Sequence, residues 1–374
     1  MNKISRCLLA GYILASIALF LYSYTQVDLN LTLSRVSIWQ TVQKAFQHVG
    51  YYQRPLSTLL YLIFLAIFFL LYFLTLRFIK KLSKKELWII IITVTLLLFA
   101  SYPAFSYDMF NYMFTAKTVL VYHQNPYAVI PLQFTGVDTW INFMRWTHLP
   151  SAYTPFWILL TLPAYLFGFG YFLLIMWNIK LMVAGFYLLT IWGIGKVMQK
   201  LDKDLETKAI AVFALNPLII VECLISSHND IVMMAFGMLA MALYLNKRTA
   251  LSYITLAFSV AAKLMTIFLI PAYIFRWNRI AALVFIVFGF ILVLFQREVL
   301  PWYWVWVMPF VALLPQFRKL TLLAGAVSLG LLLRYAPFLY FGDYNPPVPL
   351  LNNWLTILPI GVALVILGYR YLNS

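Results

Sequence analysis

Solid apolar blocks separated by short basic segments make up most of this chain. Two clear examples are Leu56–Leu76 and Leu87–Ala100, which contain no charged residue. Such runs approach the roughly 20 residues that a helix needs to cross a hydrocarbon core. They do not alternate as the strands of a closed barrel do, so the pattern indicates helices. We predict an all-α, polytopic transmembrane bundle of about 11–13 membrane helices.

The basic segments between these blocks predict the topology, because cytoplasmic loops collect Lys and Arg. With those segments on one face, Pro103–Pro150 becomes a long loop on the other, suited to short interfacial helices. Only one crossing then fits before Lys196. We assign it to Tyr171–Trp192 and predict that Ala152–Phe167 is only partly inserted. The basic segments are "MNKISR" at the start, Arg77–Glu86, Lys196–Lys208, Asn246–Arg248, Arg276–Arg279, Phe317–Lys319 and Arg370.

The whole chain, residues 1–374, is predicted to be one integral membrane domain. Residues 1–86 form an N-terminal helix pair, 87–315 the core, and 316–374 the C-terminal helices. Hydrophobic residues make up 64% of the chain and charged residues 10%, which excludes a soluble globular domain. The Lys and Arg residues that give the net charge of +16 lie between the spans and do not form a nucleic-acid-binding face. Cys7 and Cys223 both lie in apolar runs, so no disulfide framework is expected.

Asp108, in "SYDMFNYMFTAK", stands out because only 11 residues of the chain are acidic. A solvated helix cap is the simple interpretation. However, Tyr112 and Lys117 follow within nine residues and could bind sugar hydroxyls with it. A carboxylate in that setting can act as a general base toward an acceptor hydroxyl.

A second polar group lies in "NPLIIVECLISSHND", which contains Glu222, His228, Asn229 and Asp230. The simple interpretation is a polar turn with one hydrogen-bonded buried acid. Glu222, His228 and Asp230 could instead hold a divalent cation such as magnesium or manganese, or an acceptor sugar. The residues leave these alternatives open, and no other cofactor is predicted.

Lys263 interrupts the apolar run "AFSVAAKLMTIFLIP". It either extends to the membrane interface or provides a cation for an anionic substrate. In "REVLPWYWVWVMP", Arg297 and Glu298 precede four aromatic residues that we interpret as interfacial anchors, namely Trp302, Tyr303, Trp304 and Trp306. No phosphate-binding glycine loop, nucleophile elbow or zinc motif is present. The substrate must therefore arrive through the membrane or from the outer face.

Several of these motifs resemble the GT-C glycosyltransferases that use polyprenyl-phosphate sugars. The Asp108 loop with its Asn-Pro-Tyr resembles their first outer loop, and "NPLIIVECLISSHND" resembles their Asn-Pro…Glu…Gly-His-Asn-Asp segment. "YTP", "AAKLMTIFLIP" and "LPWYWVWVMP" add weaker similarities, so the likeness runs from Ser101 to about Pro315. Asn111 stands where relatives often have Arg, and Ser227 replaces the Gly before His228.

The resemblance implies an inverting transferase with Asp108 as the base, Lys263 on the donor phosphate and a cavity lined by Glu222, His228 and Asp230. With Asn111 in place of Arg, a phosphate contact is expected at Arg145 or Lys117. The predicted enzyme moves a hexose, most simply mannose, from a polyprenyl-phosphate donor to a hydroxyl of a lipid-linked or envelope glycan. It would work on the outer face of a cell membrane, which we predict to be a bacterial cytoplasmic membrane. The substrate-binding candidates are Tyr112, Lys117, Arg145, Glu222, His228, Asn229, Asp230 and Lys263.

A membrane transporter or flippase is the alternative, because it also needs charged groups and broken helices inside a bundle. Transporters of that kind contain an internal repeat, and this sequence shows none. Their polar groups lie at mid-depth, whereas we expect these groups near the outer helix ends.

Overall fold

The computed structural model describes the backbone of residues 1–372 and the side chains of residues 1–369. Within that range every regular element is helical and no strand occurs, which confirms the all-α prediction. Six helical segments are long and apolar enough to cross a membrane. A seventh is added if the bent pair Lys203–Ala214 and Pro217–Ile225 counts as one span. The six segments are Lys3–Gln26, Arg54–Arg77, Phe172–Leu201, Arg279–Gln296, Arg318–Phe341 and Val348–Tyr369.

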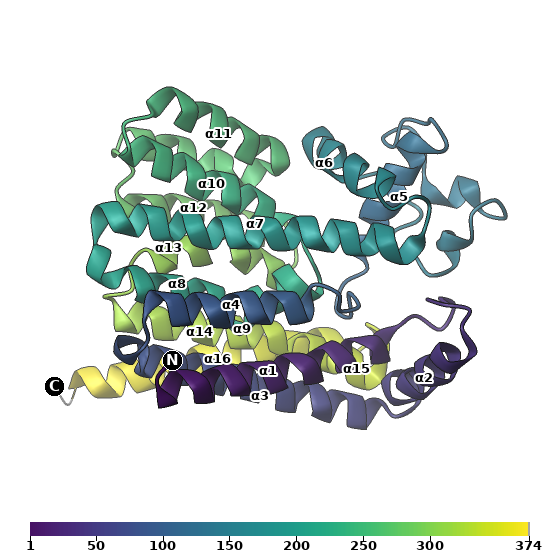
Figure 1. Ribbon diagram of the computed structural model, residues 1–374, viewed down its shortest axis with the longest axis horizontal. Coiled ribbons are helices and arrows are strands. Elements are labelled where there is room, and N and C mark those ends of the chain that lie inside the picture. The colour runs from purple at the N-terminus through teal and green to yellow at the C-terminus, as the bar shows by residue number, and fades with distance from the viewer. Residues whose placement is uncertain (373–374) are drawn as a thin grey trace.

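The helices are arranged in one elongated bundle (Figure 1). Their bounds are α1 Lys3–Ser23, α2 Ser37–Gln47, α3 Arg54–Arg77, α4 Lys84–Leu98, α5 Asp108–Leu120, α6 Pro155–Leu166, α7 Phe172–Leu201 and α8 Glu206–Ala214. The chain continues with α9 Pro217–Ile220, α10 Asp230–Leu245, α11 Thr249–Ala262, α12 Arg279–Gln296, α13 Met308–Ala312, α14 Arg318–Leu333, α15 Tyr335–Phe341 and α16 Val348–Leu372. Three further elements bear on the site: the π-helical η7 Val221–Ile225 and the 3-10 helices η8 Leu264–Tyr273 and η9 Pro301–Trp306.

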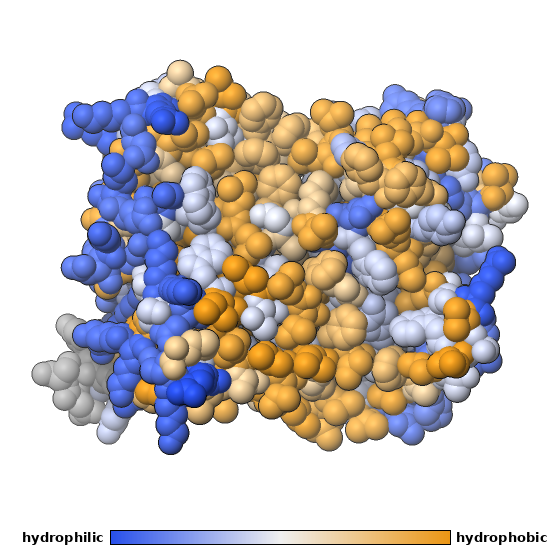
Figure 2. All heavy atoms as spheres, viewed as in Figure 1, coloured by the Kyte–Doolittle hydropathy of each residue, from blue (hydrophilic) through white to orange (hydrophobic). Residues whose placement is uncertain are grey.

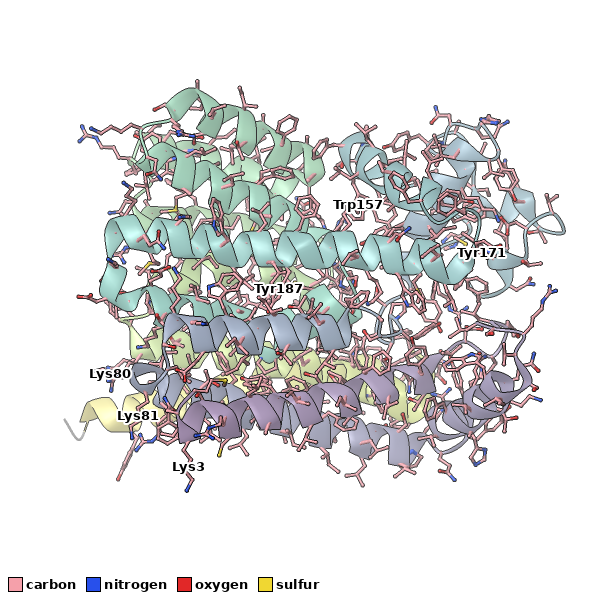
Figure 3. The ribbon with its side chains drawn as sticks, viewed as in Figure 1. Lys3, Lys80, Lys81, Trp157, Tyr171 and Tyr187 are labelled. Atoms are coloured by element: carbon pink, nitrogen blue, oxygen red, sulfur yellow. The ribbon has the colours of Figure 1, made fainter. Side chains whose placement is uncertain are left out.

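The two ends of the bundle differ in charge. Hydrophilic residues form a dense band at the left of Figure 2, and Lys3, Lys80 and Lys81 project from that side in Figure 3. We call this the lysine-rich end. Helix α4 begins at this end, and a capping box formed by Ser83 and Glu86 stabilises its N-terminus. Glu86 also accepts a hydrogen bond from the Ser5 hydroxyl (2.7 Å), which ties α1 to α4.

Helix α7 is the longest element and organises the site. Its 30 residues extend about 45 Å, more than the roughly 30 Å hydrocarbon thickness. Figure 3 shows Tyr171 near the start of α7 and Tyr187 farther along it, toward the lysine-rich end. The α10–α11 hairpin packs beside the half of α7 near the lysine-rich end, and α5 and α6 beside the other half (Figure 1).

Several helices are too short to cross a membrane alone. Helix α6 has 12 residues, or about 18 Å, and partial insertion of Ala152–Phe167 stays a prediction. Helix α11 ends at Ala262, and the backbone of Lys263 is extended, so the α-helix breaks at Lys263. Pro271 lies within the following 3-10 helix η8. The chain bends by 58° between α8 and α9, where Pro217 cannot donate a backbone hydrogen bond.

Candidate active site

A cavity of about 720 Å³ lies where the short helices end. We call it the main cavity. One wall is formed by α5 and the loop between α5 and α6, and the other by the ends of α11 and α12 with η8 and η9. Three of the predicted site residues are on its wall, namely Asp108, Asn229 and Lys263. Near Lys263 the rim is apolar, with Leu264 and Ile267 67% and 45% exposed. The main cavity thus joins charged groups to a surface suited to lipid.

Asp108 is the first residue of α5, so its carboxylate lies at a helix N-terminus. Its backbone N–H donates to the Ser106 hydroxyl at 3.2 Å, and its side chain is 22% exposed. Burial raises the pKa of the Asp108 carboxyl. The charges of His228 and Lys263 offset part of that rise. The simple interpretation of Asp108 as a solvated cap therefore does not hold.

His228 lies behind Asp108 and connects it to Glu222. Its Nε2 is 3.7 Å from the Asp108 carboxylate and 3.0 Å from the Ser106 hydroxyl. Its Nδ1 is 2.8 Å from a Glu222 oxygen, although the angle is not that of an aligned hydrogen bond. Burial lowers the pKa of His228, but the Glu222 and Asp108 carboxylates more than compensate and the net pKa is raised. The two carboxylates therefore favour the protonated form of the imidazole next to Asp108.

Glu222 is fully buried in η7, a π-helical turn of the kind often found at functional sites. Its other carboxylate oxygen accepts a hydrogen bond from the Tyr335 hydroxyl at 2.9 Å. The His228 ring stacks on Trp302 with centroids 4.2 Å apart. The series from Tyr335 through Glu222 and His228 to Asp108 fixes the position of the carboxylate on the wall.

Asp230, the first residue of α10, holds Lys263, which is the second charged group on the cavity wall. Its carboxylate accepts from the Lys263 ammonium at 2.7 Å and from the Trp306 indole N–H. The other oxygen of Asp230 is buried and has no hydrogen-bond partner. Only Lys263 reaches the cavity wall, with its side chain 30% exposed. Asp230 thus orients Lys263 toward the main cavity and remains partly unsatisfied itself.

The remaining predicted residues lie outside the cavity wall. Tyr112 is buried, accepts a hydrogen bond from the Asn229 backbone N–H at 3.3 Å and packs against Trp157. Lys117 is 2.6 Å from Asp138, and Arg145 is 3.4 Å from Asp28. Neither Lys117 nor Arg145 lines the main cavity.

The aromatic cluster after Arg297 lies at the main cavity, contrary to the prediction from the sequence. Trp302, Tyr303 and Trp306 line the main cavity, and Trp306 is only 3% exposed, so the prediction of interfacial anchors is wrong for them. In the 3-10 helix η9, residues three apart lie on the same side. An aromatic run in the sequence does not reveal this geometry, so it cannot show which rings face inward. Arg297 also lines the main cavity, and no described carboxylate lies within 4 Å of its guanidinium.

Lys180, in the first third of α7, was not among the predicted site residues. Its fully buried ammonium donates to the backbone carbonyls of Leu224 and Ile225 at 2.8 Å each and to the Ser227 hydroxyl at 3.0 Å. Ser227 has a positive φ of 57°, a conformation that glycine adopts without strain. This conformation is consistent with the Gly that precedes the His in the Gly-His-Asn-Asp segment of the GT-C enzymes that this chain resembles. The sequence signal was a lone Lys inside an apolar helix.

The predicted cation site receives no support from the geometry. Within the described residues, no group of three or more His, Cys, Asp or Glu side chains is arranged to hold a metal ion. Glu222 instead contacts Tyr335 and His228, and Asp230 contacts Lys263.

Fold and site together define a multi-pass membrane protein with an acid and a cation facing one cavity. A family model described as "Alpha-(1->6)-mannopyranosyltransferase, N-terminal domain" matches residues 9–281. The chain belongs to this family, which confirms the glycosyltransferase and mannosyltransferase predictions. The matched region contains Asp108, Glu222, His228, Asp230 and Lys263, but it ends before Arg297. No curated protein and no solved structure matches the chain significantly.

Proposed function

We propose that this mannosyltransferase takes mannose from a polyprenyl-phosphate donor and transfers it to a hydroxyl of a lipid-linked or envelope glycan. The observation that carries the proposal is the main cavity, which has Asp108 and Lys263 on its wall and an apolar rim at Leu264 and Ile267. Such a cavity suits a lipid-linked sugar, whose chain lies in the bilayer and whose head is charged. A nucleotide-sugar donor would need a polar binding domain, and none is described.

In the proposed reaction, the Asp108 carboxylate accepts the proton of the acceptor hydroxyl as its oxygen attacks the anomeric carbon. The bond between that carbon and the phosphate oxygen breaks, and polyprenyl phosphate leaves as an anion. Lys263 and Arg297 offset the charge that develops on the phosphate. Displacement of this kind inverts the anomeric centre, so an alpha product requires a beta-linked donor. The (1→6) linkage in the family description would make a primary C6 hydroxyl the nucleophile.

The lysine-rich end marks the cytoplasmic side if its Lys and Arg obey the positive-inside rule. The cavity-lining loop between α5 and α6 would then lie on the outer side, where lipid-linked sugars are the available donors. Family membership favours this enzyme over a transporter. The burial of Glu222, His228 and Asp230 does not distinguish the two classes, because both place polar groups inside a helical bundle.

The test is transfer from labelled polyprenyl-phosphate-mannose to a lipid extract by the purified full chain. We expect Asp108→Asn to lower kcat by about 10²–10⁴-fold, the usual contribution of a general base. Asp343→Asn, which removes an exposed carboxylate that does not line the main cavity, is the matched control and should keep activity. Equal activity of both variants would remove Asp108 from the mechanism. If another lipid-linked sugar were transferred and mannose were not, polyprenyl-phosphate-mannose would be ruled out as the donor.

A further inference from the structure

A second cavity of about 1000 Å³ lies at the lysine-rich end, between the ends of α3, α8 and α14. We call it the basic pocket. Four cations and one acid line it, together with apolar side chains of the two spans. The residues used below are Arg77, Lys80, Lys208 and Arg318 as cations, Asp204 as the acid, and Phe73, Leu76 and Leu322 as the apolar wall.

The charges of the basic pocket are not balanced by the protein. No described carboxylate lies within 4 Å of any of the four cations, Asp204 included. Lys208 is also close enough to Arg318 and Lys80 to be repelled by both. By contrast, Lys84 at the same end is paired with Glu206. An anion is therefore the missing partner of the basic pocket.

The apolar wall indicates where that anion comes from. Phe73 and Leu76 lie on α3, and Leu322 lies on α14, and both helices belong to candidate membrane spans. Phe73 is 41% exposed, so it is available for contact. The basic pocket thus continues from clustered charge to lipid-facing helix surface. A free anion would use only the charged part.

The positive-inside rule accounts for the presence of Lys and Arg at this end, but not for their position. Topology alone requires cations only on the connecting segments, where water solvates each one separately. Here four cations from α3, α8, α14 and the 3-10 helix η3 (Ile79–Lys81) share one cavity. Basic pockets between transmembrane helices on the cytoplasmic side are suited to phosphate head groups of acidic lipids.

We propose that the basic pocket binds the phosphate head group of an anionic phospholipid, whose acyl chains lie along Phe73, Leu76 and Leu322. The bound phosphate neutralises the repelling cations and holds α3, α8 and α14 together. This binding is independent of mannosyl transfer at the main cavity.

The experiment is a thermal-unfolding titration of the full chain in detergent, followed by tryptophan fluorescence. The additives are phosphatidylglycerol, cardiolipin, phosphatidylcholine and inorganic phosphate. A ligand that binds only the folded state raises Tm with its concentration. We expect both anionic lipids to raise Tm and the other two additives to leave it unchanged. Lys208→Gln/Arg318→Gln should weaken lipid binding roughly thirtyfold, because each cation near an anionic surface contributes about 1 kcal/mol.

The matched control is Lys3→Gln/Lys85→Gln, which removes two exposed cations of the same end that do not line the basic pocket. It should bind lipid like the unmodified chain. Equal weakening in both double variants would mean general surface attraction and would overturn the site, as would equal stabilisation by phosphatidylcholine. A Tm rise with inorganic phosphate alone would overturn the lipid as the source of the anion.

Folding of the pocket variant is itself informative. Because the substitution removes repelling charges, its Tm without lipid should equal or exceed that of the unmodified chain. If it does not fold, Arg77→Gln, at the exposed end of α3, replaces it in the same titration. Unchanged lipid binding by Arg77→Gln would then contradict the proposal.

Discussion

Two neighbouring regions away from the lysine-rich end differ in how the charges of their ion pairs balance, and a separate pair joins Arg334 to Glu298. The first region comprises the end of α5 and the loop between α5 and α6, and we call it the loop region. There Lys117 pairs with Asp138 and Arg145 with Asp28, one cation for each carboxylate. At the main cavity, the carboxylates of Asp108, Glu222 and Asp230 share His228 and Lys263, and only Lys263 carries a permanent charge.

This difference separates charges that support the fold from charges available for chemistry. A balanced pair such as Lys117 with Asp138 has no remaining demand for a ligand. An acid that is buried with incomplete compensation has a perturbed pKa, which is typical of functional sites. Asp108 combines burial with a position on the cavity wall. Charge balance therefore distinguishes the two regions better than residue type does.

The largest expected effect in this comparison comes from Lys180, which supports the cavity without touching it. Lys180→Met leaves the buried Ile225 carbonyl and the Ser227 hydroxyl without their Lys180 partner, at about 1–3 kcal/mol for each group, while the Leu224 carbonyl keeps the Ser101 hydroxyl at 3.3 Å. The His228 turn should then lose its position, and kcat should fall about 100-fold, as when a catalytic group is misplaced by an ångström. The measurement is steady-state transfer together with thermal unfolding.

Ser227→Gly is the matched control for Lys180→Met. It removes one of the three partners of Lys180 and also relieves the positive φ at residue 227. We expect transfer close to that of the unmodified chain. A role limited to overall stability would be indicated if Lys180→Met lowered Tm but kept kcat and the pH profile unchanged.

A smaller effect is expected when cations of the two regions are compared directly. Arg297→Gln should lower kcat/KM for the donor at least roughly tenfold, because a charge-assisted hydrogen bond to phosphate contributes about 1.5 kcal/mol or more. Arg145→Gln removes a cation that is already paired with Asp28 and should change kcat/KM little. The reverse order would place the donor phosphate in the loop region, as the resemblance first suggested.

The smallest effect is a shift in pH dependence. The base must be ionised to accept a proton, and burial raises the pKa of Asp108, so the acid limb of kcat should lie above the range of an ordinary Asp. Positive charge on His228 lowers the pKa of Asp108. His228→Gln should therefore move the acid limb to higher pH. Movement to lower pH, or an acid limb identical in Asp108→Glu and His228→Gln, would assign the titration to another group.

The sequence predicted the main elements of the fold and part of the site. Apolar block length predicted a helical multi-span bundle, and the basic segments predicted one charged end, which Figure 2 shows. Asp108 and Lys263 could be identified because charges are rare in apolar surroundings. Trp302, Trp306 and Arg297 were misjudged or overlooked, since an aromatic or basic residue near a span end has the same sequence pattern whether it faces lipid or a cavity.

By itself, the sequence determined class and composition, namely a membrane-embedded helical transferase with few acids. Those properties follow from the hydrocarbon environment, which acts on every residue according to its position along the chain. Only the tertiary structure decided which charges pair. Asp108 and Glu222 are 114 residues apart in sequence, yet His228 contacts both. Lys117 is close to Asp108 in sequence but binds Asp138. Pairing depends on packing between distant helices, which no local pattern encodes.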